Sequence, residues 1–187
     1  MLAGFADWLC HRYARIEFTT GVRESAIHLL MLAEAAVAVL LGLFFEITGL
    51  VLLIMFGAWL LHEATSFWDV SYAAARRKVG PLEQRVHDYL GVVPFLALSL
   101  VFALHWPQVL AVIGLGTEPP DFGIRWKEPP LPAAYIAGLL VTITLLELGP
   151  FTEELWRGLR ARRRRCAYRA DRGDTATQPV SAAGDDR

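Results

Sequence analysis

The sequence predicts an all-α fold: an integral membrane four-helix bundle with interfacial amphipathic helices. Of its 187 residues, 55% are hydrophobic, and these gather in long runs instead of spreading evenly. Each run approaches the roughly 20 apolar residues that a helix needs to cross the hydrocarbon core of a bilayer. Runs such as AAVAVLLGLFF and LVLLIMFGAWLL also lack the polar face that a helix of a soluble bundle would show.

Four apolar segments are the predicted membrane spans. Within residues 26–61 the charged side chains are Glu34 and Glu46, so this region divides into two spans joined by the short connection FEITG. Such a short connection predicts an antiparallel helical hairpin. The third span contains Pro94, which should kink it, and Pro150 is expected to interrupt the helix just after the fourth. The spans cover about residues 26–44, 48–64, 90–114 and 131–148.

The segments that flank the spans complete the predicted organisation. Residues 1–22 form an N-terminal interfacial segment, because Leu2, Phe5, Trp8 and Leu9 recur at helical spacing. Residues 23–165 form the four-span bundle. Residues 166–187 are basic and polar and are predicted to be a disordered tail.

The basic residues predict the orientation of the chain in the membrane. Of its 18 Lys and Arg residues, Arg125 and Lys127 lie between the third and fourth spans, and all others lie on the opposite side. Lys and Arg resist translocation, so both termini are predicted to be cytosolic. This basic face is expected to attract anionic membrane lipids and not nucleic acid, since a basic run directly after a span is explained by topology.

Polar residues inside or beside a span are costly and therefore indicate function. Here they concentrate at one depth, toward the cytosolic ends of the spans. Residues three, four or seven apart share a helix face, and Glu83 with His87, His62 with Asp69, and Glu147 with Glu154 have such spacings. We expect metal ligands at His28, Glu34, His62, Glu63, Glu83 and His87, with Asp69, Glu147 and Glu154 as supporting partners or additional ligands.

Imidazole and carboxylate together favour iron, manganese or zinc, and helical bundles build dinuclear centres from such residues. The chain departs from the soluble di-iron pattern, which uses Glu-x-x-His on two helices. The first hypothesis is thus a membrane metalloprotein that performs redox or hydrolytic chemistry on a lipid or quinone. Its metal centre could be dinuclear and of the iron type.

Two alternatives remain open at this level. Histidines on facing spans could instead ligate haem b axially, with His28 and either His62 or His87 at compatible depths. In the other alternative the protein is a non-enzymatic scaffold, assembly factor or transport-associated subunit. Its polar cluster would then be an ion-pair network, and its partner would be another protein or a second copy of the chain. His105 lies too far along the third span to join a site at His87.

Overall fold

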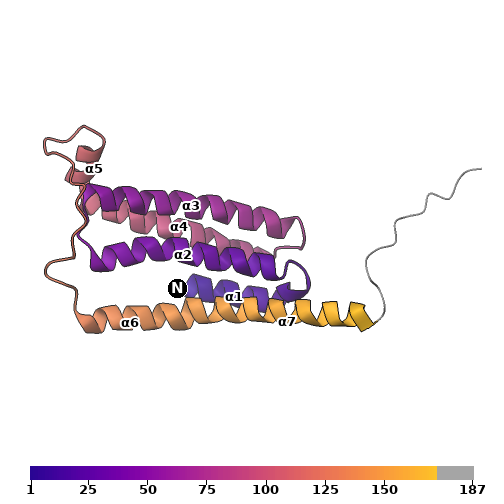
Figure 1. Ribbon diagram of the computed structural model, residues 1–187. Helices are drawn as coiled ribbons and strands as arrows, with labels where there is room; N and C mark the ends of the chain where they lie inside the picture. Colours follow the sequence, from indigo (N-terminus) through magenta and orange to yellow (C-terminus); the bar gives the residue numbers. More distant parts are fainter. Residues whose placement is uncertain (172–187) are drawn as a thin grey trace, which may run out of the picture.

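A computed structural model describes residues 1–171 of the chain, and helices account for most of this part (Figure 1). Short helical turns follow the first helix (Ile16–Phe18) and divide the last long one (η2, Thr144–Leu148). The α-helices are α1 (Leu2–Ala14), α2 (Val22–Phe44), α3 (Gly49–Ala74), α4 (Pro81–Leu104), α5 (Trp106–Val112), α6 (Ala133–Ile143) and α7 (Gly149–Asp171).

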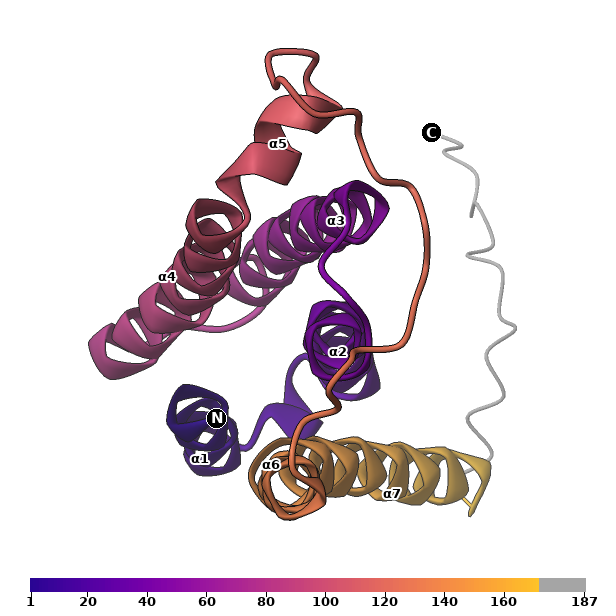
Figure 2. The same cartoon turned by 90° about the vertical axis from the view of Figure 1, so that its left-hand side faces the viewer.

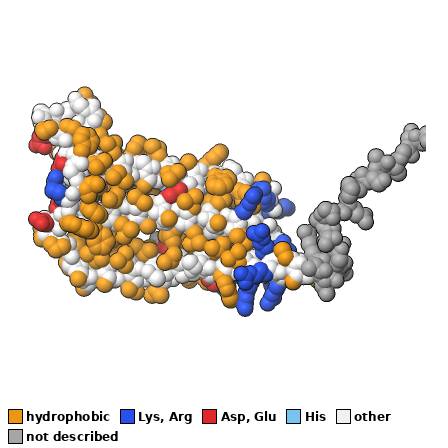
Figure 3. Space-filling model, in the orientation of Figure 1, with side chains coloured by type: hydrophobic (Ala, Val, Ile, Leu, Met, Phe, Trp, Pro, Cys, Tyr) orange, Lys and Arg blue, Asp and Glu red, His pale blue; other side chains and the backbone are white. Residues whose placement is uncertain are grey.

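Within residues 1–171, four helical stretches are long and apolar enough to cross a membrane: α2, α3, α4 and the continuous stretch Ala133–Tyr168. They run side by side, and hydrophobic side chains cover most of the visible surface of the bundle (Figure 3). The predicted all-α four-helix fold is confirmed, and the chain is a multi-pass membrane protein. Helix α3 continues past the second apolar run to Ala74, whereas α4 ends at Leu104, before the end of the third predicted span.

The hairpin of α2 and α3 forms the centre of the bundle, as its short connection predicts. Thr48 caps α3, its hydroxyl accepting from the backbone N–H of Val51 at 3.3 Å. Gly49 is needed beside this cap, because a Cβ there would lie 2.7 Å from a methyl group of Val112. Buried Val51, Met55 and Leu98 continue the apolar core toward α4.

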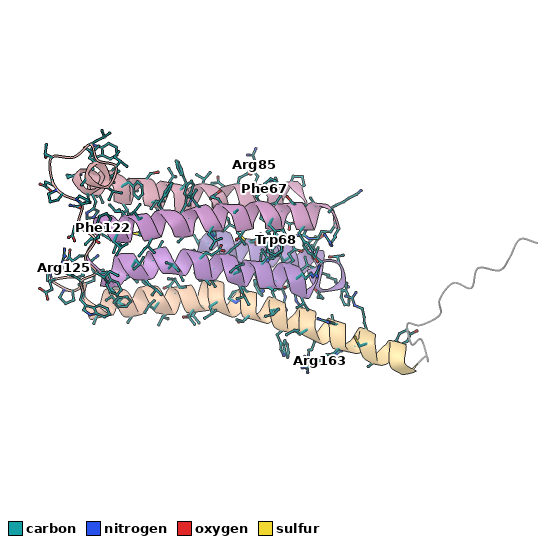
Figure 4. All side chains as sticks on the ribbon, turned by 45° about the horizontal axis from the view of Figure 1, so that its top comes forward. Phe67, Trp68, Arg85, Phe122, Arg125 and Arg163 are labelled. Carbon is teal, nitrogen blue, oxygen red and sulfur yellow. The ribbon has the colours of Figure 1, made fainter. Side chains whose placement is uncertain are left out.

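The two ends of the bundle carry different side chains. At one end, Trp126 of the loop before α6 stacks on Phe45 with ring centroids 4.6 Å apart. Phe122 and Arg125 project from this loop, whereas Arg163 lies on α7 at the opposite end (Figure 4). Lys and Arg side chains gather at that opposite end, which we call the basic end (Figure 3).

The last long helix continues through Pro150 instead of ending there, so the predicted interruption is wrong. A π-helical turn, Thr144–Leu148, directly precedes α7. Proline lacks an N–H and its ring clashes with the carbonyl four residues earlier, and a widened turn accommodates both defects. The helix therefore carries Glu147 and Glu154 along the bundle without a break.

The first helix lies beside α4 and α7 (Figure 2). The side view in Figure 1 shows it in the half of the bundle that leads to the basic end. Asp7 and His11 of α1 are buried, while Leu2 and Tyr13 are exposed. The placement of residues 1–22 at a membrane interface stays a prediction. Helix α7 reaches Asp171, inside the predicted tail of 166–187, and the rest of that tail lies outside the described residues.

Candidate metal centre

Acidic and imidazole side chains from five helices meet inside the basic half of the bundle. Their spacing along each helix places them on the face that points into the bundle, and α1 packs between α2, α4 and α7. All but His87 are buried residues, and the His87 side chain is only 9% exposed. The cluster comprises Asp7 and His11 of α1, Glu24 and His28 of α2, Asp69 of α3, Glu83 and His87 of α4, and Glu154 of α7.

The imidazole of His11 lies at the centre of this cluster and has no exposed side-chain surface. Its Nε2 atom is 3.3 Å from Glu83 Oε1, 3.4 Å from Asp7 Oδ1 and 3.8 Å from Glu24 Oε1. Among residues 1–171, nonetheless, no group makes an aligned hydrogen bond with this nitrogen. A buried nitrogen close to carboxylate oxygens but without an aligned hydrogen bond requires an explanation, and a bound cation is one.

Glu154 joins His11 to His28. Its Oε2 atom is 3.0 Å from His11 Nδ1, and its Oε1 atom is 2.9 Å from His28 Nδ1. An ionised carboxylate can only accept, so both Nδ1 atoms donate to Glu154, and His28 Nε2 is in turn hydrogen-bonded to Asp69 at 3.2 Å. Metal-binding histidines commonly have this arrangement, in which a carboxylate holds the nitrogen that does not bind the metal.

Two further contacts extend the cluster to α3 and α4. Asp69 Oδ2 lies 3.2 Å from His28 Nε2, and Asp7 Oδ1 lies 3.0 Å from His87 Nε2. Asp7 Oδ1 and His87 Nε2 also lack hydrogen-bond partners in the described part of the chain. Like His11 Nε2, these two atoms are buried without an aligned hydrogen bond.

Arg77, in the connection between α3 and α4, neutralises part of the acidic charge. Its guanidinium donates to Glu24 and to Glu83, with Nη1 at 2.9 Å from Glu83 Oε2. Within residues 1–171 the ion pairs of Arg77 are with Glu24 and Glu83, and not with Asp7, Asp69 or Glu154. Buried negative charge of this size requires protonated imidazoles or bound cations.

The pKa values of the α1 groups show how strongly the cluster favours positive charge. Burial alone would lower the pKa of His11, but Asp7, Glu154 and Glu83 outweigh burial and raise it to about 9. Burial likewise opposes ionisation of Asp7, yet the neighbouring His11, His87 and His28 hold the pKa of its carboxyl below the ordinary value. The metal-free cluster therefore holds a proton on His11 at neutral pH.

The structure brings five of the nine predicted site residues into this cluster: His28, Asp69, Glu83, His87 and Glu154. It places the other four elsewhere among residues 1–171. Glu34 accepts from Thr65 at 2.8 Å and lies 3.9 Å from His62, about 9 Å deeper in the bundle than His28. Glu147 pairs with the N-terminal amine at 3.1 Å. Glu63 lines a groove between α3 and α4.

Sequence reasoning missed Asp7, His11, Glu24 and Arg77, although a signal for three of them was present. The spacing of Glu83 and His87 recurs twice, in Asp7-x-x-x-His11 and Glu24-x-x-x-His28. Residues four apart share a helix face, so each motif presents an acid and an imidazole together. Three acid-x-x-x-His motifs, on α1, α2 and α4, form most of the cluster.

Two overlapping groups of side chains could hold a metal ion. Ligand atoms of Asp7, His11 and His87 lie within 4.8 Å of one another, as do those of His11, Glu24 and His28. Nitrogen and oxygen ligands bind zinc-like ions at about 2.0–2.2 Å, which places neighbouring ligand atoms roughly 3–4 Å apart. The distances of 3.0–3.8 Å around His11 Nε2 and Asp7 Oδ1 fit such an ion.

No protein-family model matches this chain, and the comparisons with curated proteins and with solved structures give no match.

Proposed function

We propose that this protein is an integral membrane metalloprotein with an iron-, manganese- or zinc-type ion at the basic end, acting on a lipid-soluble substrate. Asp7, His11 and His87 are the proposed ligands, and Glu83 or Glu24 completes the coordination. The single observation that carries the proposal is the buried His11 Nε2 atom, which faces three carboxylates without a hydrogen bond to any of the described residues.

The ligand chemistry supports this class of metal. Imidazole with carboxylate suits iron, manganese and zinc better than soft ions, which prefer thiolate. The nearby Cys10 is only partly buried, and burial together with Asp7 and Glu83 raises the pKa of its thiol. A thiol with a raised pKa is a poor metal ligand, so the oxygen and nitrogen donors dominate.

A second ion beside the first is part of the proposal. His11, Glu24 and His28 form the second group of potential ligands, and Asp69 contacts His28. Carboxylates that face both groups are typical of dinuclear centres in helical bundles. Bound metal would supply Lewis acidity or redox chemistry, while Glu154 orients both imidazoles and Arg77 limits the negative charge of Glu24 and Glu83.

Haem b receives less support from this geometry. The rings of His11 and His28 stack face to face with centroids 4.6 Å apart. Axial haem ligands instead direct their nitrogens at the iron from opposite sides of the porphyrin. The carboxylates around these rings also favour a bare cation over a macrocycle.

The proposal is tested by elemental analysis of the detergent-purified protein after exposure to Fe²⁺, Mn²⁺ and Zn²⁺ in turn. We expect at least one equivalent of one metal in the wild type and less than a tenth of that in His11→Gln. His105→Gln is the matched control, because His105 lies at the far end of α4, and it should retain the metal. A wild type that binds no equivalent of any of the three ions would contradict the proposal.

The scaffold alternative rests on the Arg77 bridge between Glu24 and Glu83, which resembles a structural ion-pair network. In that case imidazolium groups balance the remaining carboxylates, and helix packing is the only role of the cluster. Added metal then leaves the thermal unfolding temperature unchanged. A metalloprotein is stabilised by its ion, because binding to the folded state alone shifts the unfolding equilibrium.

The orientation in the membrane is also proposed here. Exposed arginines of α7 and the connection between α3 and α4 lie at the basic end, and Arg125 and Lys127 lie at the other. The excess of Lys and Arg on the cytosolic side of membrane proteins supports a cytosolic basic end. The metal cluster then lies in the cytosolic half of the bundle.

A further inference from the structure

Positive and negative side chains are segregated in the basic half of the bundle. Five carboxylates of this half are buried in the metal cluster: Asp7, Glu24, Asp69, Glu83 and Glu154. Most of its Lys and Arg side chains stay outside the cluster and gather on the surface at the basic end (Figure 3). The formal net charge of -1 for the whole chain therefore conceals a strongly positive surface at this end.

Most of the exposed cations at this end have no carboxylate partner among the described residues. The Lys and Arg side chains that do form ion pairs with carboxylates are Arg12, Arg77, Arg85, Arg125 and Arg157. The exposed arginines of α7 outside this set are Arg160, Arg162, Arg163, Arg164 and Arg165. The other exposed cations outside it lie between α1 and α4, and they are Arg15, Arg23, Arg76 and Lys78. Their charge is left for an anion from outside the described chain.

The arginines are most crowded on α7. Arg163 and Arg164 lie three and four residues after Arg160, so the three side chains are neighbours on the helix surface. Arg163 projects from the outer side of the helix (Figure 4). Like charges at these spacings repel one another and destabilise a helix, and an anion bound between them removes the repulsion.

This stretch of α7 also marks the edge of the apolar surface. Toward the middle of the bundle, the large exposed side chains of the last long helix are apolar, among them Leu145 and Leu148. Trp156 is exposed, and the guanidinium of Arg160 lies over its ring, 4.1 Å from the centroid. Trp and Tyr gather at the level of the lipid headgroups, where an apolar ring and a polar edge are both satisfied. The arginines that follow Trp156 therefore lie at the level of the lipid phosphates.

The positive charge is distributed around the bundle. A second arginine–aromatic contact lies near the end of α3, where Arg76 is 3.8 Å from the ring centroid of Tyr72. Helices α3 and α7 lie on opposite sides of α2 (Figure 2). Lipid headgroups surround a membrane bundle on every side, whereas a protein or nucleic-acid partner contacts one face. The distribution of the cations therefore favours lipid.

We propose that the basic end binds the headgroups of anionic phospholipids, with Arg160, Arg163 and Arg164 as the principal contacts on α7. Phosphate oxygens accept hydrogen bonds from the guanidinium groups, and acyl chains lie along the apolar surface beside Trp156. Clusters of about four to eight Lys and Arg residues directly after a span are typical of such binding. The proposal does not depend on the metal centre, because these arginines lie outside the cluster.

The test is electron paramagnetic resonance of spin-labelled phosphatidylglycerol and phosphatidylcholine, added to the full chain in phosphatidylcholine bilayers. The fraction of each lipid that the protein immobilises gives its relative affinity. We expect the wild type to prefer phosphatidylglycerol by at least about threefold. The preference should fall between about 0.15 M and about 1 M NaCl, because the Debye length shortens from about 8 Å to about 3 Å.

Paired substitutions locate the binding surface. Arg160→Gln with Arg163→Gln should reduce the preference for phosphatidylglycerol by at least half, whereas Arg160→Lys with Arg163→Lys should retain most of it. The matched control is Arg125→Gln with Lys127→Gln, which removes the same charge at the opposite end. There Arg125 pairs with Asp121, and Lys127 donates to the carbonyl of Gly42, so the control should keep the wild-type preference.

Three results would overturn the proposal. The first is equal immobilisation of the two lipids by the wild type, and the second is an equal loss of preference in the two glutamine variants. The third is a wild type without lipid preference that binds single-stranded RNA or polyglutamate, which would assign the arginines to a nucleic acid or an acidic protein.

Discussion

His11 and His28 stack face to face, with ring centroids 4.6 Å apart and an angle of 6° between the ring planes. They come from α1 and α2, and the carboxylate of Glu154 from α7 contacts the Nδ1 atom of each ring. One side chain therefore fixes the orientation of two imidazoles and directs their Nε2 atoms toward different carboxylates. This relationship makes Glu154 the residue on which the geometry of the cluster depends.

Replacing Glu154 by alanine should lower metal affinity about 10–100-fold, the usual effect of removing a carboxylate that orients a metal-binding histidine. Competition with a chelator of known affinity measures the change. Glu153→Ala is the control, because the neighbouring Glu153 contacts Trp8 and Arg12 and is 33% exposed at its side chain. Equal affinities of the two variants would contradict the orienting role.

The spans could be predicted from the sequence because hydrocarbon imposes a minimum length of apolar residues, which α2 and α3 display directly. The depth of His28, Asp69, Glu83 and His87 was predictable for the same reason. The direction in which each side chain points was not. Glu34 lies about 9 Å deeper than His28 and accepts from Thr65, whereas Glu147 faces the N-terminal amine instead of the cluster.

The role of α1 does not follow from its hydrophobic spacing, because its exposed apolar residues indicate a surface helix. Leu2 is 80% exposed, while the polar face with Asp7 and His11 is buried. Hydrophobic spacing reports which residues avoid water, but in a membrane protein the buried face can be the polar one. The repeated acid-x-x-x-His motif is the feature that identifies this face.

The stability of the metal-free protein should fall as pH rises from about 6.5 to about 9, the ordinary and folded-state pKa values of His11. A group whose pKa is raised by folding stabilises the folded state while it is protonated, so the contribution is complete below the lower value and lost above the higher. Unfolding temperatures across this range, in the presence of a chelator, measure the effect. His11→Gln should remove this part of the pH dependence, and an unchanged profile in that variant would refute the assignment.

Arg77→Met should destabilise the bundle by about 3–5 kcal/mol, because it leaves Glu24 and Glu83 buried without their cation. Denaturant unfolding in detergent measures the loss. Arg76→Met is the matched control, since the adjacent Arg76 is exposed and lies over the ring of Tyr72, 3.8 Å from its centroid. A similar loss in both variants would show that the Arg77 bridge has no special role.

Labelling of cysteines from one side of the membrane tests the orientation. In a Cys10→Ala background the exposed Cys166 marks the basic end. Glu118→Cys, with Cys166→Ser added, marks the exposed loop at the other end, between α5 and α6. Because Lys and Arg resist translocation, a membrane-impermeant maleimide applied to intact cells should label the cysteine at position 118 and leave Cys166 unlabelled until the membrane is permeabilised. The reverse pattern would place the metal cluster in the non-cytosolic half of the bundle and would require its substrate and metal to arrive from the opposite side.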